Sequence, residues 1–226
     1  MQVERAVILA AGLGTRLKWM TKHHPKALVQ IQDEAAIVHV IRQLAKQGIH
    51  QIVINTHHHA EILQRFLGNG ERWGVNLWFS HEEILLDSGG GVRTALQYLP
   101  GEGGFVVHNA DVIADVDVHT LADLCPYQGC ALALVDNPRH HPQGDFAIEH
   151  GFIRLQGEPM YTFAGVSVWD EEVFQSYACG TPFSLLKVMH TLIKKDKCKA
   201  WRHRGQWFDI GRPKDVIRAN RDWVSS

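Results

Sequence analysis

Short apolar runs of strand length alternate with amphipathic segments along the first half of the chain. The runs cover residues 6–10, 51–55, 77–79 and 105–108, and helical spacing of apolar positions falls between them, in residues 37–44, 62–67 and 92–99. In the first helical segment apolar residues recur at i, i+3, i+4 and i+7, which places them on one helix face. This strict alternation predicts parallel strands joined by right-handed crossovers.

The pattern changes after Asp111. Strand-like runs there follow one another with short connections, at residues 130–135, 145–149, 152–155 and 163–169. Helical periodicity returns at residues 184–195, strands are expected near 199–209, and a closing helix with proline in its first turn is expected at 213–223. No linker, repeat or low-complexity stretch divides the chain. We therefore predict one α/β domain over residues 1–226, a Rossmann-like three-layer sandwich with a mostly parallel mixed sheet.

Composition narrows the class of protein. Of the 226 residues 45% are hydrophobic and 21% are charged, and the formal net charge is −1. No apolar run approaches the roughly 18 residues of a membrane span, and no signal peptide precedes the first strand, so we expect a cytoplasmic protein. Nucleic-acid binding has little support, because the charge is near zero and the basic residues concentrate in one loop. The four cysteines show no C-x-x-C pair, so we expect neither disulfides nor a metal cluster.

The first candidate chemistry is a glycine loop after the first strand. Gly12 and Gly14 would let backbone N–H groups approach a phosphate chain, and Arg16 could neutralise it. No Asp or Glu occurs from Arg5 to Gln32, which is typical of a local polyanion site and equally of a solvated basic face. A lone G-x-G is also common in tight turns, so this pattern alone leaves function open. The dinucleotide fingerprint is excluded, since Leu17 stands where it needs glycine.

The stretch from Leu9 to Leu28, which contains Gly-Leu-Gly-Thr-Arg and Pro25-Lys26-Ala27-Leu28, resembles the signature of the sugar-1-phosphate nucleotidyltransferases. Trp19 and Ala27 replace two prolines of that signature. The resemblance implies the nucleotide-diphospho-sugar transferase fold and the transfer of a nucleoside monophosphate from an NTP to a sugar 1-phosphate. It also implies nucleotide contacts from Ala11, Gly12, Gly14, Thr15, Arg16 and Lys26, with Arg16 and Lys26 also catalytic.

Two aspartates at predicted strand ends match the metal carboxylates of the same family. Asp111 and Asp209 would hold Mg²⁺, which commonly takes one or two carboxylates together with substrate oxygens. Each aspartate taken alone is as readily a turn residue. The chain has Asn109-Ala110-Asp111 where relatives have Asn-Gly-Asp, so we expect the added methyl to affect this loop. Gly89, in a triple glycine, matches the segment that approaches the nucleobase, although the segment also suits a helix start.

Several later segments are similar to uridylyltransferases that act on N-acetylmuramate α-1-phosphate in bacterial cell-wall recycling. They are residues 134–141, 144–146, 162–167 and 205–209. The resemblance implies UTP as the nucleotide and sugar contacts from Asn109, Asp145 and Gly165. A cation for the lactyl carboxylate of that sugar would come from Arg139 or Arg204. We expect a monomer or small homo-oligomer without nucleic-acid or membrane partners.

The expected reaction is in-line attack of the sugar phosphate on the α-phosphorus, with release of pyrophosphate. The second pKa of a phosphate monoester is about 6, so the nucleophile is charged at neutral pH and needs no general base. Other acceptors remain open, namely a hexose 1-phosphate, a heptose 1-phosphate or phosphocholine. So does a non-catalytic nucleotide-binding regulatory protein. His57-His58-His59 is not expected to bind a metal, because consecutive side chains point in different directions.

Overall fold

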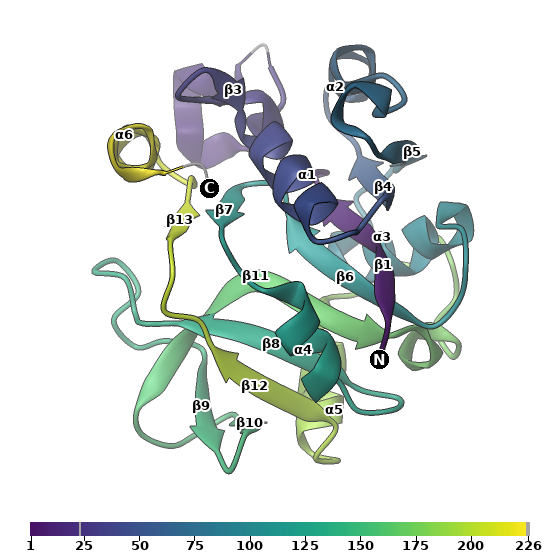
Figure 1. The fold of residues 1–226 in the computed structure, drawn as a ribbon, viewed down its shortest axis with the longest axis vertical. Helices are drawn as coiled ribbons and strands as arrows, with labels where there is room; N and C mark the ends of the chain where they lie inside the picture. The colour runs from purple at the N-terminus through teal and green to yellow at the C-terminus, as the bar shows by residue number, and fades with distance from the viewer. Residues whose placement is uncertain (23, 225–226) are drawn as a thin grey trace.

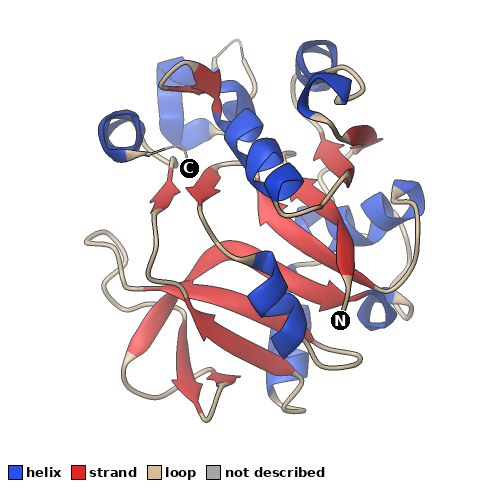
Figure 2. Ribbon diagram, viewed as in Figure 1, coloured by secondary structure: helices blue, strands red, loops and turns tan. Residues whose placement is uncertain are grey.

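The computed structural model describes residues 1–22 and 24–224, without the side chains of residues 18 and 19; the replacement of a signature proline at Trp19 therefore lies outside the described side chains. A nine-stranded sheet crosses the molecule with helices on both faces (Figures 1 and 2). Among the described residues, no helix is both long and apolar enough to cross a membrane.

The sheet has a parallel half and a mixed half. Its order is β5-β4-β1-β6-β11-β8-β12-β10-β9, and β5, β4, β1 and β6 run parallel. These four strands are Asn76–His81, Gln51–Thr56, Val3–Leu9 and Gly104–Asn109. The long strand β11 is antiparallel to both β6 and β8, and β12 returns parallel to β8. The strands of the mixed half are β8 (Cys130–Val135), β9 (Phe146–Glu149), β10 (Phe152–Arg154), β11 (Met160–Asp170) and β12 (Cys198–Arg202).

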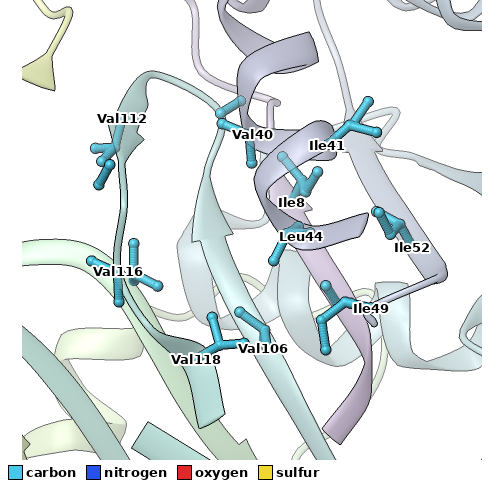
Figure 3. Packing of buried hydrophobic residues seen from close by; sticks show 14 of the residues in the cluster. Ile8, Val40, Ile41, Leu44, Ile49, Ile52, Val106, Val112, Val116 and Val118 are labelled. Carbon is cyan, nitrogen blue, oxygen red and sulfur yellow. The ribbon is translucent and has the colours of Figure 1, made fainter. Parts of the chain in front are cut away.

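Two apolar layers hold the helices onto the sheet. One face is covered by α1 (Ala36–Lys46), α2 (Ala60–Leu67) and α4 (Val118–Leu124). Figure 3 shows this layer, where Val40, Ile41 and Leu44 of α1 pack beside Ile8 and Ile52 of the strands. The other face is covered by α3 (Asp87–Ala95) and α5 (Leu185–Ile193). A third cluster joins α6 (Pro213–Asp222) to the glycine-loop region through Leu17 and Ile210.

Short elements carry the loops at the strand ends. They are the 3-10 helices η1 (Thr15–Thr21), η2 (Lys26–Leu28), η3 (Glu71–Trp73), η4 (Leu96–Tyr98) and η5 (Glu171–Phe174), and the strands β2 (Gln30–Ile31), β3 (Glu34–Ala35), β7 (Val112–Ala114) and β13 (Trp207–Asp209). β7 and β13 pair antiparallel as a separate two-stranded ribbon and lie side by side in Figure 1.

The predicted fold class is confirmed, with local differences. α3 begins at Asp87 instead of residue 92 and includes the triple glycine. Glycine is a poor helix former, but Gly89 and Gly90 both donate to the carbonyl oxygen of Phe183, at 2.8 and 3.0 Å, and this tertiary contact overrides propensity. β7 and α4 were not predicted, because three and seven residues are too few to display a period.

Candidate active site

The glycine loop lies between two polar strand ends. In the sheet register Leu9, the last residue of β1, is opposite Asn55 of β4 and Asn109 of β6. The backbone that follows Leu9 therefore emerges at the carboxyl edge of the parallel half, where ligands bind in open α/β sheets.

A first cavity of about 310 Å³ opens at this edge. Its wall includes the loop backbone at Ala10, Ala11 and Gly12. The remaining walls come from the ends of β4, β5 and β6, the start of α3 and η2; they include Lys26, Asn55, Glu82, Leu85, Asp87, Ser88, Asn109 and Asp111.

A second cavity of about 310 Å³ adjoins the first, since Asn109 and Asp111 line both. Its other walls come from β11, β13 and the loops beside them; they include Arg16, His140, His141, Phe163, Gly165, Trp207, Asp209 and Arg212. Gly165 has φ +77°, and a Cβ there would lie 2.8 Å from Asn109 Nδ2, so this position requires glycine. The two cavities meet at Asn109 and Asp111. We call the two cavities together the cleft.

The β7–β13 ribbon brings the two predicted metal aspartates together. Asp209 ends β13 opposite Val112, and the N–H of Ile210 donates to the carbonyl oxygen of Asp111 at 2.9 Å. Asp111 immediately precedes β7. Backbone pairing thus sets the separation of two residues that are far apart in the sequence.

Lys26 and Arg16 reach the same place from the first loop. Lys26 Nζ donates to Asp111 Oδ2 in an ion pair, with side chains 11% and 25% exposed. A Cβ added to Gly211 would lie 3.4 Å from Arg16 Cζ and 3.1 Å from Asp209 Oδ1, so both side chains converge on that glycine. The structure therefore gathers all four charged residues that the sequence selected for catalysis and metal binding.

The charges of this group are not fully balanced. The pKa of Asp209 is raised, first by burial and then by repulsion from Asp111, while Lys26 and Arg16 oppose the rise. Burial lowers the pKa of the neighbouring His108 to about 4, so that ring is neutral at pH 7. A divalent cation bound between the two carboxylates would offset their mutual repulsion and favour the charged form of both. Carboxylate oxygen is also a ligand that Mg²⁺ prefers. Among the described residues there is no group of three or more His, Cys, Asp or Glu that could form an all-protein metal cage.

The other sequence-predicted residues fall into two groups. Ala11, Gly12, Asn109 and Gly165 line the cavities. Gly14, Thr15 and Gly89 are not among the described wall residues of either cavity, and Gly89 is buried against the Phe183 ring. Asp87 and Ser88 line the first cavity where Gly89 was expected.

Asp145, predicted to bind the sugar, is not among the described wall residues of the second cavity but contacts two of them. His141 Nε2 lies 2.9 Å from its Oδ1, and the Phe163 N–H donates to its Oδ2 at 2.8 Å. Because His141 and Phe163 line the cavity, Asp145 orders its rim. Arg139 and Arg204, named as partners for a carboxylate, are exposed and outside the described cavity walls, whereas Arg212 lines the second cavity.

The methyl of Ala110 packs inside the molecule. Ala110 is 3% exposed within the apolar layer, and its N–H donates to Leu9 O at 3.0 Å. The strand end that carries Asn109 and Asp111 is therefore tied to β1 by the backbone.

Sequence reasoning missed Asn55, Glu82 and Arg212. Asn55 could have been found by the rule that selected Asp111, because it is the last residue but one of a buried parallel strand. Glu82 directly follows β5, and only its burial at 2% exposure distinguishes it from the exposed Glu83. Nothing in the local pattern separates Arg212 from the other arginines of the second half.

Comparison with known proteins agrees with this geometry. The profile of the family described as "Nucleotidyl transferase" matches residues 5–226. An N-acetylmuramate alpha-1-phosphate uridylyltransferase of Neisseria meningitidis serogroup B is 32% identical over 215 residues, which span 92% of this chain and 93% of that protein. A protein of the same name from Caulobacter vibrioides is 31% identical and spans 95% of this chain and 94% of its own length.

Among solved structures, a Bacillus anthracis protein assigned as a glucose-1-phosphate thymidylyltransferase, crystallised with a sucrose, superposes with a TM-score of 0.85. It covers 100% of this chain and 98% of its own, at 21% identity, and shows the shared fold. Since the family profile spans nearly all of the sequence, the chain belongs to the nucleotidyl transferase family.

Proposed function

We propose that the chain transfers UMP from UTP to N-acetylmuramate α-1-phosphate and releases pyrophosphate. The observation that carries the proposal is the meeting of Lys26, Arg16, Asp111 and Asp209 where two adjoining cavities touch. Transfer between two bound substrates needs two sites with the charged groups between them. The relatives from Neisseria and Caulobacter support the choice of sugar and nucleotide.

The charges of the first cavity orient the nucleotide. Glu82 is a buried acid of the wall and is hydrogen-bonded to Asn55, whereas Lys26 pairs with Asp111, which lines both cavities. A triphosphate would be repelled by Glu82 and attracted by Lys26 and Arg16. The neutral base therefore belongs beside Asn55 and Glu82, and the phosphates belong at the junction of the cavities.

The second cavity suits an acceptor that carries an acid. Arg212 lines it together with His140 and His141. The pKa of His140 is lowered, first by burial and then by the nearby positive charge of Arg212. We assign to Arg212 the lactyl carboxylate of the sugar, in place of Arg139 or Arg204, because a guanidinium on the wall can form a paired hydrogen bond with it.

The reaction then requires positioning and charge neutralisation. The sugar phosphate is already charged at neutral pH, so its oxygen attacks the α-phosphorus without a protein base. Lys26 and Arg16 stabilise the charge that develops on the phosphate oxygens. Asp111 and Asp209 would hold Mg²⁺, which when bound neutralises further phosphate charge.

The test is a substrate matrix read by pyrophosphate release in the presence of Mg²⁺. UTP, CTP and GTP are each combined with N-acetylmuramate α-1-phosphate, a hexose 1-phosphate, a heptose 1-phosphate and phosphocholine. The proposal predicts that UTP with N-acetylmuramate α-1-phosphate has the highest kcat/KM. A different best pair would reassign the substrates, and nucleotide binding without turnover on any acceptor would indicate a regulatory protein.

A further inference from the structure

A chain of buried hydrogen bonds runs within the wall of the first cavity and joins two parts of it. The Ala10 N–H donates to Asn55 Oδ1 at 2.7 Å, Asn55 Nδ2 donates to Glu82 Oε1 at 2.7 Å, and the Leu86 N–H donates to Glu82 Oε2 at 3.0 Å. We call this chain the Asn55–Glu82 relay. Asn55 is 3% exposed and Glu82 is 2% exposed.

The two ends of the relay are backbone groups that shape the cavity. Ala10 begins the glycine loop, and Leu86 is the residue immediately before α3. Glu82 itself is held by its main chain, because its N–H donates to Thr56 O at 2.8 Å and its carbonyl oxygen lies 2.7 Å from His57 Nδ1. The relay therefore fixes the glycine loop relative to the first turn of α3.

Gly91 shows how closely the relay is packed. A Cβ at this position would lie 2.6 Å from Asn55 Nδ2 and 2.7 Å from Glu82 Oε1. These distances are shorter than side-chain atoms tolerate, so the third glycine of the triplet makes room for the relay and not for a ligand.

The relay works only with one amide and one carboxylate. Both ends, Ala10 and Leu86, are N–H donors, so each middle residue must present an oxygen outward. The bond between the two middle side chains then needs one N–H donor on one residue and one oxygen acceptor on the other, as Asn55 Nδ2 and Glu82 Oε1 provide. With two ionised carboxylates the middle lacks a proton donor, and the pair would have to take up a proton to replace it. With two amides, two NH₂ or N–H groups confront one another. Which residue carries the amide is immaterial to this count.

We propose that Asn55 and Glu82 are positioning residues for the nucleotide, which hold the glycine loop and the start of α3 at the separation the base requires. The identity of the ligand rests on the proposed function. Neither residue needs to contact the reacting phosphates. Breaking the relay should weaken nucleotide binding and leave recognition of the acceptor in the second cavity intact.

The test exchanges the two side-chain types. Asn55→Asp alone places two carboxylates face to face, and Glu82→Gln alone places two donors face to face. The double variant Asn55→Asp/Glu82→Gln restores every donor–acceptor pair with the charge moved to position 55. Because the glycine loop and the start of α3 would no longer be held at the separation that fits the base, we expect each single variant to bind Mg–UTP roughly tenfold more weakly. The double variant should return to within about threefold of the wild type.

Binding is measured by equilibrium titration of the intact chain with Mg–UTP, and kinetics give KM for each substrate. The single variants should raise KM for the nucleotide and leave KM for the sugar 1-phosphate unchanged, a split that general loss of stability would not produce. Matched controls are Gln51→Glu on the same strand and the exposed Glu83→Gln, both expected to bind as the wild type.

Single variants that bind Mg–UTP as tightly as the wild type would overturn the inference. The inference would also be overturned by a double variant that does not fold, or that binds Mg–UTP as weakly as the weaker of the two single variants. The measurement on the double variant remains decisive even if the single variants do not fold. A wild-type chain that binds UTP without transferring UMP would refute the proposed function alone, because the titration still tests the relay. A wild-type chain that binds no nucleotide would refute both.

Discussion

The two halves of the cleft are built in different ways. The first cavity is walled by strand ends, loop backbone and a buried relay in which both middle side chains are hydrogen-bonded. The second is walled partly by β11 and β13 and partly by side chains such as Arg16, His140 and Arg212, which lie outside the strands. The first cavity thus rests on a buried hydrogen-bonded network, whereas the second relies more on charged side chains that the loops supply.

The largest effect is expected where the two cavities meet. Lys26→Ala removes the cation that pairs with Asp111 and that the proposed function assigns to the phosphates, so kcat should fall about a thousandfold. The measurement is steady-state pyrophosphate release, with circular dichroism to verify folding. Lys22→Ala, an exposed lysine of the same basic loop, is the matched control and should retain full turnover. Normal turnover without Lys26 would mean that the chemistry takes place elsewhere.

A smaller and more selective effect is expected in the second cavity. Arg212→Ala should raise KM for N-acetylmuramate α-1-phosphate by roughly 10- to 100-fold, since a charged hydrogen bond contributes about 1.5–3 kcal/mol. KM for UTP should not change, because Arg212 lines only the acceptor side of the described cleft. Arg139→Ala and Arg204→Ala provide exposed controls. An equal rise in both KM values would contradict the assignment of the second cavity to the acceptor alone.

The smallest effect is expected in stability, and it has the opposite sign to the loss of activity. Because the folded-state pKa of Asp209 is raised, the folded chain holds a proton more tightly there than the unfolded chain does. Stability therefore falls as pH rises through the window between the ordinary carboxyl pKa and the raised one. Asp209→Asn removes this loss, so at pH 7 in EDTA its melting temperature should exceed that of the wild type by a few degrees.

The same comparison in acid provides the check on that prediction. Below the ordinary carboxyl pKa both states are protonated at Asp209, so the stability gain of Asp209→Asn should vanish there. The variant should also lose activity with Mg²⁺ present. A variant that melts below the wild type at pH 7 would show that the folded chain does not disfavour the charged form of Asp209.

Much of the parallel half could be predicted from the sequence. Four buried strands alternated with amphipathic helices, and apolar periodicity is a local property that survives in the fold. The glycine loop was recognisable for a related reason, because the end of a buried strand and its glycines are adjacent in the chain. Lys26, Asp111 and Asp209 were selected by resemblance, and the structure then placed them together.

The rest depends on contacts between distant segments. β7 and β13 have three residues each, and they are strands only because they pair with one another. The start of α3 depends on Phe183, which lies far along the chain. Periodicity does not encode the direction of single side chains. The hydrogen bond between Asn55 and Glu82 depends on such a direction, and so does the place of Arg212 on the cavity wall, where Arg139 and Arg204 are absent from the described lining.

Asp209 reaches the cleft on β13, and α6 follows that strand directly in the chain. The same segment that supplies this carboxylate also supplies Ile210 and Val216, which pack with Leu17 of the glycine-loop region in the third apolar cluster. Removal of the segment from β13 onward would therefore take away one of the two aspartates and, at the same time, part of the apolar support of the loop that carries Arg16.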